Sequence, residues 1–281
     1  MKASRVHAVI AAGLEHPHLL ARWQREPDLL RRCGVEPDAL DLDALWKFAG
    51  LTAKVRHNGL RADLPLTFRL LHVAGLEIEV FAAYAAFRTA GGARYADTTA
   101  ARAQDLSNFL EHWLDFTRRE HALLWDVLRY ELALARLSKL TAPVQLAAPA
   151  PGLTSAASLP ARPRAASVPR VCGHISLHEM RCDPRQVAAL LQEKSPRLAD
   201  VTMGSRYFCY WRQGAAAELH ILELDELGFY LLSLADGQHS VADLSRLIGG
   251  GSRPAKGLLT ALGELASVGI LAFTRTSEQV T

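Results

Sequence analysis

The sequence predicts an α+β protein: an N-terminal all-α helical bundle followed by a small winged-helix-like domain with a short antiparallel sheet and three helices. Residues 1–140 place apolar residues at helical spacing along long segments separated by short breaks. Residues 171–281 alternate polar and apolar residues over short runs and then form three short helical segments. Residues 141–170 are rich in Ala, Pro and Ser and cannot bury enough apolar surface to fold. We therefore expect two domains joined by a linker.

Start and stop signals divide the first domain into helices. Asp41 is placed to cap a helix whose apolar residues share one face. Pro65 suits the first turn of a long helix that ends at Gly91-Gly92. Thr99 is placed to cap the next helix, and a last helix runs over residues 122–137. The side chains expected in the core include Leu42, Leu45, Trp46, Ala49, Ala53, Phe68, Phe81 and Tyr84.

The second domain begins with strand patterns. Residues 174–180 alternate, and residues 206–212 and 217–224 flank a Gly-containing turn, which predicts a hairpin. Ser240 is placed to cap a helix, with Asp243 three residues later as in a capping box. The three predicted helical segments cover residues 225–234, 241–247 and 254–268.

Charge and hydropathy exclude several classes of protein. The formal net charge is +3, from 32 Lys and Arg against 29 Asp and Glu. From Val171 to the end, ten basic and twelve acidic residues give −2, which is a poor surface for a phosphate backbone. No apolar run reaches the ~18 residues that cross a bilayer, and the start lacks a secretory signal. We expect a cytoplasmic chain that binds neither membrane nor nucleic acid.

The sequence offers no organised catalytic or metal-binding set. It contains no nucleophile elbow, no phosphate-binding loop and no Gly-x-Gly-x-x-Gly after a strand. The pairs Glu111-His112 and Glu120-His121 point about 100° apart on a helix, whereas metal ligands need one face. The four cysteines form no Cys-x-x-Cys pair, so we expect free thiols. The chain is therefore not expected to be an enzyme by itself.

Two features indicate binding instead. The polar cluster at residues 54–61 is open to three interpretations: a solvated helix end, a docking surface for an acidic partner, or a nucleic-acid contact. The strand at 217–224 and the apolar helix at 254–268 supply the two parts that accept an extended peptide as an added strand. A DNA-binding role would need a basic recognition helix, but Lys256 is the only basic residue in this one.

The second domain resembles the PqqD-like domains that recognise precursor peptides in pathways for ribosomally made, post-translationally modified peptides. The resemblance covers residues 207–273, including LHILELDELGFYLLSLADGQHSVADLSRLI and LLTALGELASVGILAF. Its matching features are Leu224-Asp225, Leu231-Leu232, Asp236-Gly237, Ser240-Val241 and the stretch from Leu265 to Leu271. The whole chain, with KVRHNGLRADLPLTF and GLEIEVFAAYA before the linker, resembles partner subunits of multinuclear non-haem iron-dependent oxidases.

This resemblance implies a non-catalytic subunit without a cofactor of its own. In that family a separate TIM-barrel subunit carries the iron, and the partner binds the precursor's leader segment and docks on the oxidase. The leader would add antiparallel to the strand and lie against the third helix. The implied peptide-binding residues are Ala217, Glu218, Leu219, His220, Ile221, Leu222, Leu258, Leu259, Leu262 and Leu265. The candidate docking residues are Lys54, Arg56, His57 and Arg61.

Two other functions remain open at this point. One is a winged-helix DNA-binding transcriptional regulator whose helical half senses a ligand or dimerises. The other is an enzyme whose metal site is assembled within the bundle. Steeply salt-dependent duplex binding would indicate the first, and a stoichiometric bound metal would indicate the second.

Overall fold

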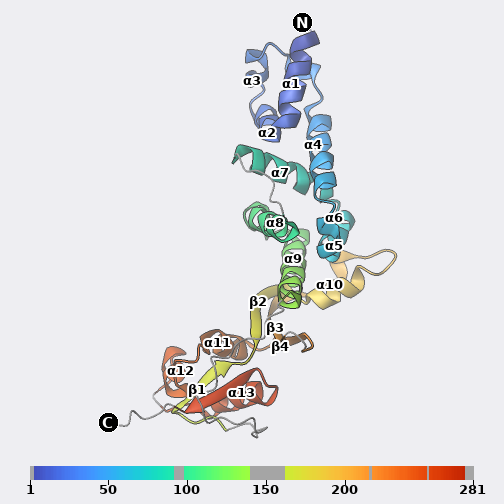
Figure 1. Ribbon diagram of the computed structural model, residues 1–281. Coiled ribbons are helices and arrows are strands. Elements are labelled where there is room, and N and C mark those ends of the chain that lie inside the picture. Colours follow the sequence, from blue (N-terminus) through green and yellow to red (C-terminus); the bar gives the residue numbers. More distant parts are fainter. Residues whose placement is uncertain (1–2, 92–97, 140–161, 215–216, 252, 276–281) are drawn as a thin grey trace. The chain divides into compact units, whose positions relative to one another are not determined.

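The computed structural model describes residues 3–91, 98–139, 162–214, 217–251 and 253–275, which belong to two compact units (Figure 1). Unit 1 comprises Met1–Leu132 with Pro184–Val201, and unit 2 comprises Ala133–Asp183 with Thr202–Thr281. The described residues are 60% helix and 14% strand, which confirms the α+β class. Residues 141–161 of the predicted linker lie outside the described residues.

Unit 1 is helical throughout its described residues. Its elements are α1 (Ala3–Glu15), α2 (Pro17–Arg25), α3 (Asp28–Arg32), η1 (Pro37–Ala39), α4 (Leu42–Arg56), α5 (Leu60–Asp63), α6 (Pro65–Val73), α7 (Glu77–Ala90), α8 (Thr99–Trp113), the first part of α9 (Arg119–Ser138), α10 (Pro184–Leu190) and η2 (Leu198–Asp200). Asp41 caps α4 as expected, because its carboxylate accepts a hydrogen bond from the Ala44 amide at 2.9 Å. The cap of α8 is Thr98 and not Thr99, since the Thr98 hydroxyl accepts from the Ala101 amide.

The single long helix expected from Pro65 is wrong, because the chain breaks between α6 and α7. Gly75 adopts a left-handed conformation with φ +69°. The Leu76 amide donates to the Leu71 carbonyl at 2.9 Å and the Gly75 amide to the His72 carbonyl at 3.1 Å, the two bonds of a Schellman motif. The two helices therefore lie at 114° to each other. Apolar spacing continues across the break, so periodicity alone did not reveal it.

Two polar anchors, the buried Glu131 and the partly buried Arg119, fix distant segments within unit 1. The Glu131 carboxylate of α9 accepts the Leu66 and Thr67 amides at 2.7 and 2.8 Å, so it caps the start of α6. Arg119 at the start of α9 donates from Nε to the Leu198 carbonyl at 2.9 Å, and its Nη2 donates to two further carbonyls around η2. This fork explains why residues 184–201 belong to unit 1, although the sequence placed them in the C-terminal domain.

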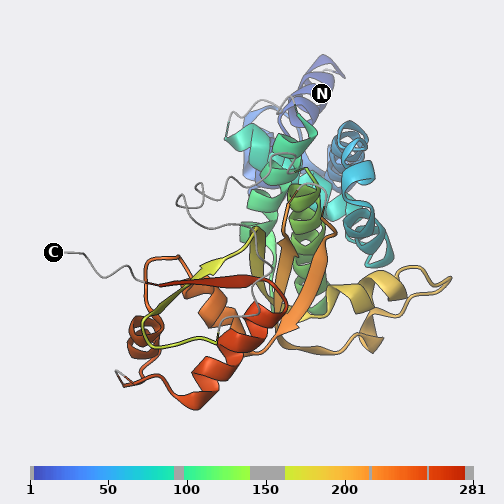
Figure 2. The same ribbon diagram turned by 60° about the horizontal axis from the view of Figure 1, so that its bottom comes forward.

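Unit 2 combines two small antiparallel sheets with three helices (Figure 2). Its elements are β1 (Ser167–Val171), β2 (His174–Cys182), β3 (Met203–Arg212), β4 (His220–Leu224), α11 (Glu226–Leu234), α12 (Val241–Leu247), α13 (Lys256–Ser267) and β5 (Leu271–Arg275), together with the end of α9. The three-stranded sheet has the order β2-β3-β4, and β1 pairs with β5. The predicted hairpin is confirmed, with Tyr207 opposite Leu224 and Trp211 opposite His220.

The end of the predicted linker is a strand. Ser167 pairs with Arg275 and Val171 with Leu271, so β1 begins inside residues 141–170. The Val168 side chain is buried. The partner strand lies about a hundred residues further along the chain, so local composition gave no sign of the pairing.

The core of unit 2 joins the three-stranded sheet to all three helices. Its fully or nearly buried members are Cys209, Trp211, Leu231, Leu232, Ala235, Val241, Leu258, Leu262, Leu265, Ile270 and Leu271. Gly269 takes φ +87° after α13, which turns the chain into β5.

Among the described residues, no single helix is long and apolar enough to cross a membrane. Together, α6 and α7 are long and apolar enough to cross a membrane, but the chain is bent by 114° between them.

Candidate functional site

The first candidate site is the outer edge of β4. This strand pairs with β3 on one side, and no described residue pairs with its other side. The regular strand begins at His220, three residues later than the sequence predicted. The Ala217 amide donates to the Gly214 carbonyl and the Ala217 carbonyl accepts from Arg212 Nε at 2.9 Å, so Ala217 still belongs to the turn. Of the implied peptide-binding residues, Ala217, Glu218 and Leu219 therefore precede the strand.

Side chains along β4 divide between the two faces of the sheet. Leu222 and Leu224 are partly buried and pack against the core of unit 2. The exposed His220 ring lies on the same face, 5.2 Å from the ring of Trp211. Ile221 and Glu223 lie on the opposite face, where Glu223 pairs with Arg206 at 2.7 Å. A peptide added at this edge would find apolar side chains on the helix-bearing face.

Helix α13 contributes less to an accessible surface than the sequence suggested. Leu258, Leu262 and Leu265 are 3%, 0% and 6% exposed and belong to the core, so a bound peptide cannot contact them without repacking. Leu259 is only partly buried. The structure therefore reduces the four implied leucines to one that a peptide can reach.

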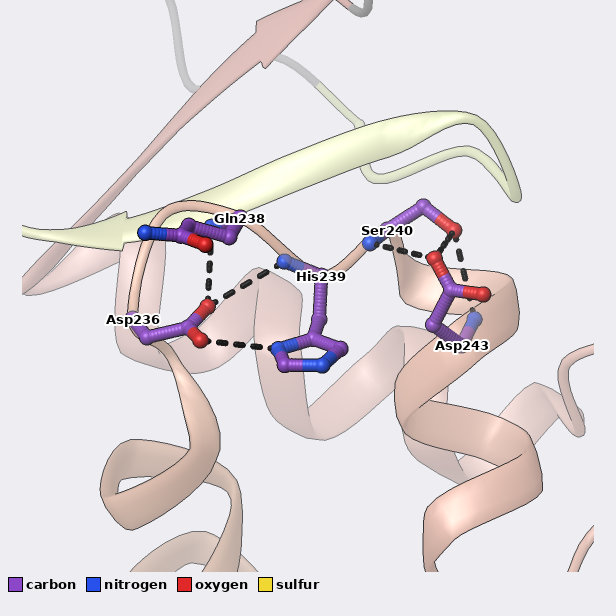
Figure 3. A network of polar contacts seen from close by, with 5 residues as sticks. All are labelled: Asp236, Gln238, His239, Ser240 and Asp243. Atoms are coloured by element: carbon purple, nitrogen blue, oxygen red, sulfur yellow. Dashed lines mark hydrogen bonds and ion pairs between the residues drawn. The ribbon is translucent and has the colours of Figure 1, made fainter.

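The turn between α11 and α12 is a structural network (Figure 3). The Asp236 carboxylate accepts the Gln238 and His239 amides and lies 2.8 Å from Nδ1 of His239. These bonds lower the pKa of Asp236. Ser240 and Asp243 form the predicted capping box, with the Ser240 amide donating to the Asp243 carboxylate at 2.9 Å. These polar groups bond to one another, so they fix the start of α12 and do not form a ligand site.

The candidate docking cluster is partly engaged by one carboxylate within unit 1. Glu77, which is 7% exposed, pairs with Lys54 Nζ at 2.7 Å and with Arg61 Nη2 at 3.0 Å. His57 is 1% exposed and belongs to the core, while Arg56 is exposed. The structure thus brings Lys54 and Arg61 together on one buried carboxylate, while half of the Arg61 side chain stays exposed.

His57 has the environment of a core aromatic residue. Its ring stacks on Phe81 with centroids 5.9 Å apart and meets the edge of Tyr84 at 5.0 Å. Burial, with the nearby charges of Arg102 and Arg88, lowers the pKa of His57 from 6.5 to about 4. The imidazole is therefore neutral at physiological pH and adds no charge to a docking surface.

An exposed apolar face on α4 was not predicted from the sequence. Phe48, Leu51 and Val55 are 54%, 47% and 66% exposed and share one side of the helix. The opposite side has small residues against α7, where a Cβ on Gly50 would lie 2.5 Å from the Ile78 carbonyl oxygen. The spacing of the exposed residues at i, i+3 and i+7 is a second apolar stripe, which was the available signal.

A groove between α1 and α4 extends this apolar face. It has a volume of about 560 Å³. Its lining includes Val6, Ile10 and Leu14 from α1 and Ala44, Leu45 and Phe48 from α4. Phe48 belongs to both the groove and the exposed stripe, so the two form one continuous apolar surface, which we call the α4 face.

Possible metal ligands and thiols are distributed over both units in the described part of the chain. No group of three or more His, Cys, Asp or Glu there is placed to hold a metal ion. All four cysteines are free thiols. Cys209 is fully buried, and burial raises the pKa of its thiol to about 12, so it remains protonated.

No protein-family model and no curated protein matches this sequence. The chain is an α+β protein with two candidate binding surfaces. One is an open strand edge in unit 2, and the other is an exposed apolar helix face in unit 1. Both features are suited to binding polypeptides.

Proposed function

We propose that this chain is a non-catalytic recognition subunit that binds the leader of a ribosomal precursor peptide. The leader adds as a strand to β4, and the subunit presents the rest of the precursor to a partner iron-dependent TIM-barrel oxidase. The observation that supports this most strongly is the open edge of β4 beside a helix-backed apolar face. An edge strand offers unpaired backbone N–H and C=O groups, which an extended peptide can satisfy.

The length of β4 limits the affinity of such a site. Five residues offer only a few outward backbone hydrogen bonds, each worth about 0.5–1.5 kcal/mol net. Ordering a flexible leader offsets part of that gain. Apolar leader side chains must therefore supply the remainder, against the partly buried Leu222, Leu224 and Leu259. We expect modest affinity that depends on both the backbone and the alternate side chains.

The α4 face is our proposed docking surface for the oxidase subunit. Exposed apolar patches on folded proteins commonly mark interaction sites. Phe48, Leu51 and Val55 leave such a patch on one helix, whereas Lys54 and Arg61 are already engaged by Glu77. The iron belongs to the oxidase subunit in this proposal, and this chain supplies recognition only.

Co-purification tests the proposal. The full chain is expressed with the product of a neighbouring open reading frame and then titrated with the labelled candidate leader. A stable complex with a barrel-type oxidase, with leader binding by this chain alone, supports the proposal. Duplex DNA binding at physiological salt, without peptide binding, would instead support a winged-helix regulator.

A further inference from the structure

The β4 edge has an exposed carboxylate just beyond each of its two ends. Residues 217–226 contain four acidic residues and no Lys or Arg. The fold uses two of them: Asp225 caps α11 by accepting the Gly228 amide, and Glu223 pairs with Arg206. The other two, Glu218 and Glu226, are exposed and form no ion pair with any other residue that the structure describes.

One carboxylate of the neighbouring strands, that of Glu179, lies near the C-terminal end of β4. Glu179 of β2 lies opposite Tyr207 of β3, and Tyr207 lies opposite Leu224 at the end of β4. Burial raises the pKa of the Tyr207 phenol, and the carboxylates of Glu226 and Glu179 raise it further. The end of β4 therefore has Glu179 nearby in addition to the two carboxylates that follow the strand in sequence, Asp225 and Glu226.

The spacing of the two exposed carboxylates suits one extended peptide. Glu218 lies two residues before β4 and Glu226 two residues after it. A strand paired with β4 advances about 3.4 Å per residue and so passes both ends within roughly eight residues. Between these ends, the partly buried Leu222 and Leu224 favour apolar peptide side chains at alternate positions.

We infer that the leader segment recognised at β4 is basic: an apolar strand flanked by Lys or Arg six to eight residues apart, which pair with Glu218 and Glu226. This inference rests on the proposed function, because it specifies the peptide that the open edge accepts. The carboxylates supply long-range attraction and fix the position of the peptide along the edge. Backbone pairing supplies the attachment itself.

Selection from a displayed library of random 15-residue peptides tests the inference. The baits are the full wild-type chain, the double variant Glu218→Lys/Glu226→Lys, and the control variant Glu193→Lys, which changes an exposed carboxylate of unit 1. All three changes are on the surface, and thermal melting checks that each variant folds.

The expected result is enrichment of Lys and Arg at two positions six to eight apart on the wild-type and control baits. The double variant should enrich Asp and Glu at those positions. A selected basic peptide should bind the double variant about tenfold more weakly, with a loss that shrinks as salt rises.

Two results would overturn the inference in different ways. The selected peptides could have alternating apolar residues but no charge preference and bind all three baits equally. That result would contradict the pairing of basic peptide residues with Glu218 and Glu226, but it would leave strand addition to β4 intact. The absence of any enrichment on the full chain would contradict the proposed function as well.

Discussion

The burial of His57 makes the stability of unit 1 depend on pH. Its pKa is about 4 in the folded chain against 6.5 for a free imidazole, a difference of about 2.5 units. The unfolded chain therefore binds this proton first as pH falls. The contribution of the neutral His57 to the free energy of unfolding is fully present above pH 6.5 and is lost as the pH drops towards 4. At about 1.36 kcal/mol per unit the full effect is about 3 kcal/mol, of which about 2 kcal/mol is lost between pH 7 and pH 5.

The variant His57→Phe tests this reasoning, because it keeps an aromatic ring between Phe81 and Tyr84 but removes the titrating group. Urea unfolding is followed by tryptophan fluorescence at pH 7 and pH 5 for both proteins. Four of the five tryptophans report on unit 1, namely Trp23, Trp46, Trp113 and Trp125. The loss of unfolding free energy between the two pH values should be about 2 kcal/mol smaller in the variant. An equal loss of unfolding free energy in both proteins would refute the conclusion that His57 is buried and neutral.

Three further predictions concern core packing, docking and the cap of α6. Leu262→Ala should destabilise unit 2 by about 2–5 kcal/mol through a core cavity, whereas Leu259→Ala should cost less, as thermal melting will show. Leu51→Asp should leave stability within about 0.5 kcal/mol but abolish oxidase co-purification, while the control Leu247→Asp, also exposed, should not. Glu131→Ala leaves the Leu66 and Thr67 amides without their acceptor and should cost about 1–3 kcal/mol in urea unfolding.

A specific result would contradict each of these three predictions. Equal melting temperatures for the two leucine variants would mean that α13 is packed differently. Retention of the oxidase by Leu51→Asp would remove the α4 face from the docking proposal. An unchanged urea midpoint for Glu131→Ala would show that its two hydrogen bonds add nothing to stability.

Local signals in the sequence predicted local structure well. Asp41 and the Ser240–Asp243 box cap the expected helices, because a cap depends on residues within one turn. The β3–β4 hairpin follows from two alternating runs around a short turn. In each case the interacting groups are close in sequence, so the pattern contains the information needed.

The sequence pattern did not predict long-range strand pairing or the burial of individual side chains, because both depend on residues far apart in the sequence. β1 was assigned to a linker because its partner strand, β5, is about a hundred residues away. His57 and Lys54 looked like a basic surface, since their sequence gives no sign of the Phe81 and Tyr84 rings or of Glu77. Leu262 and Leu259 have the same chemistry, and only the packed core distinguishes the buried one from the accessible one.

A backbone N-methyl scan of the leader tests whether a peptide binds by strand addition to β4. In an antiparallel pair, alternate residues direct their N–H and C=O groups towards the neighbouring strand. N-methylation at those positions should weaken binding to the full chain about tenfold or more, while the intervening positions tolerate it. A strict alternation of loss and tolerance over the residues opposite His220–Leu224 is the result we predict. Uniform tolerance along the leader would contradict strand addition.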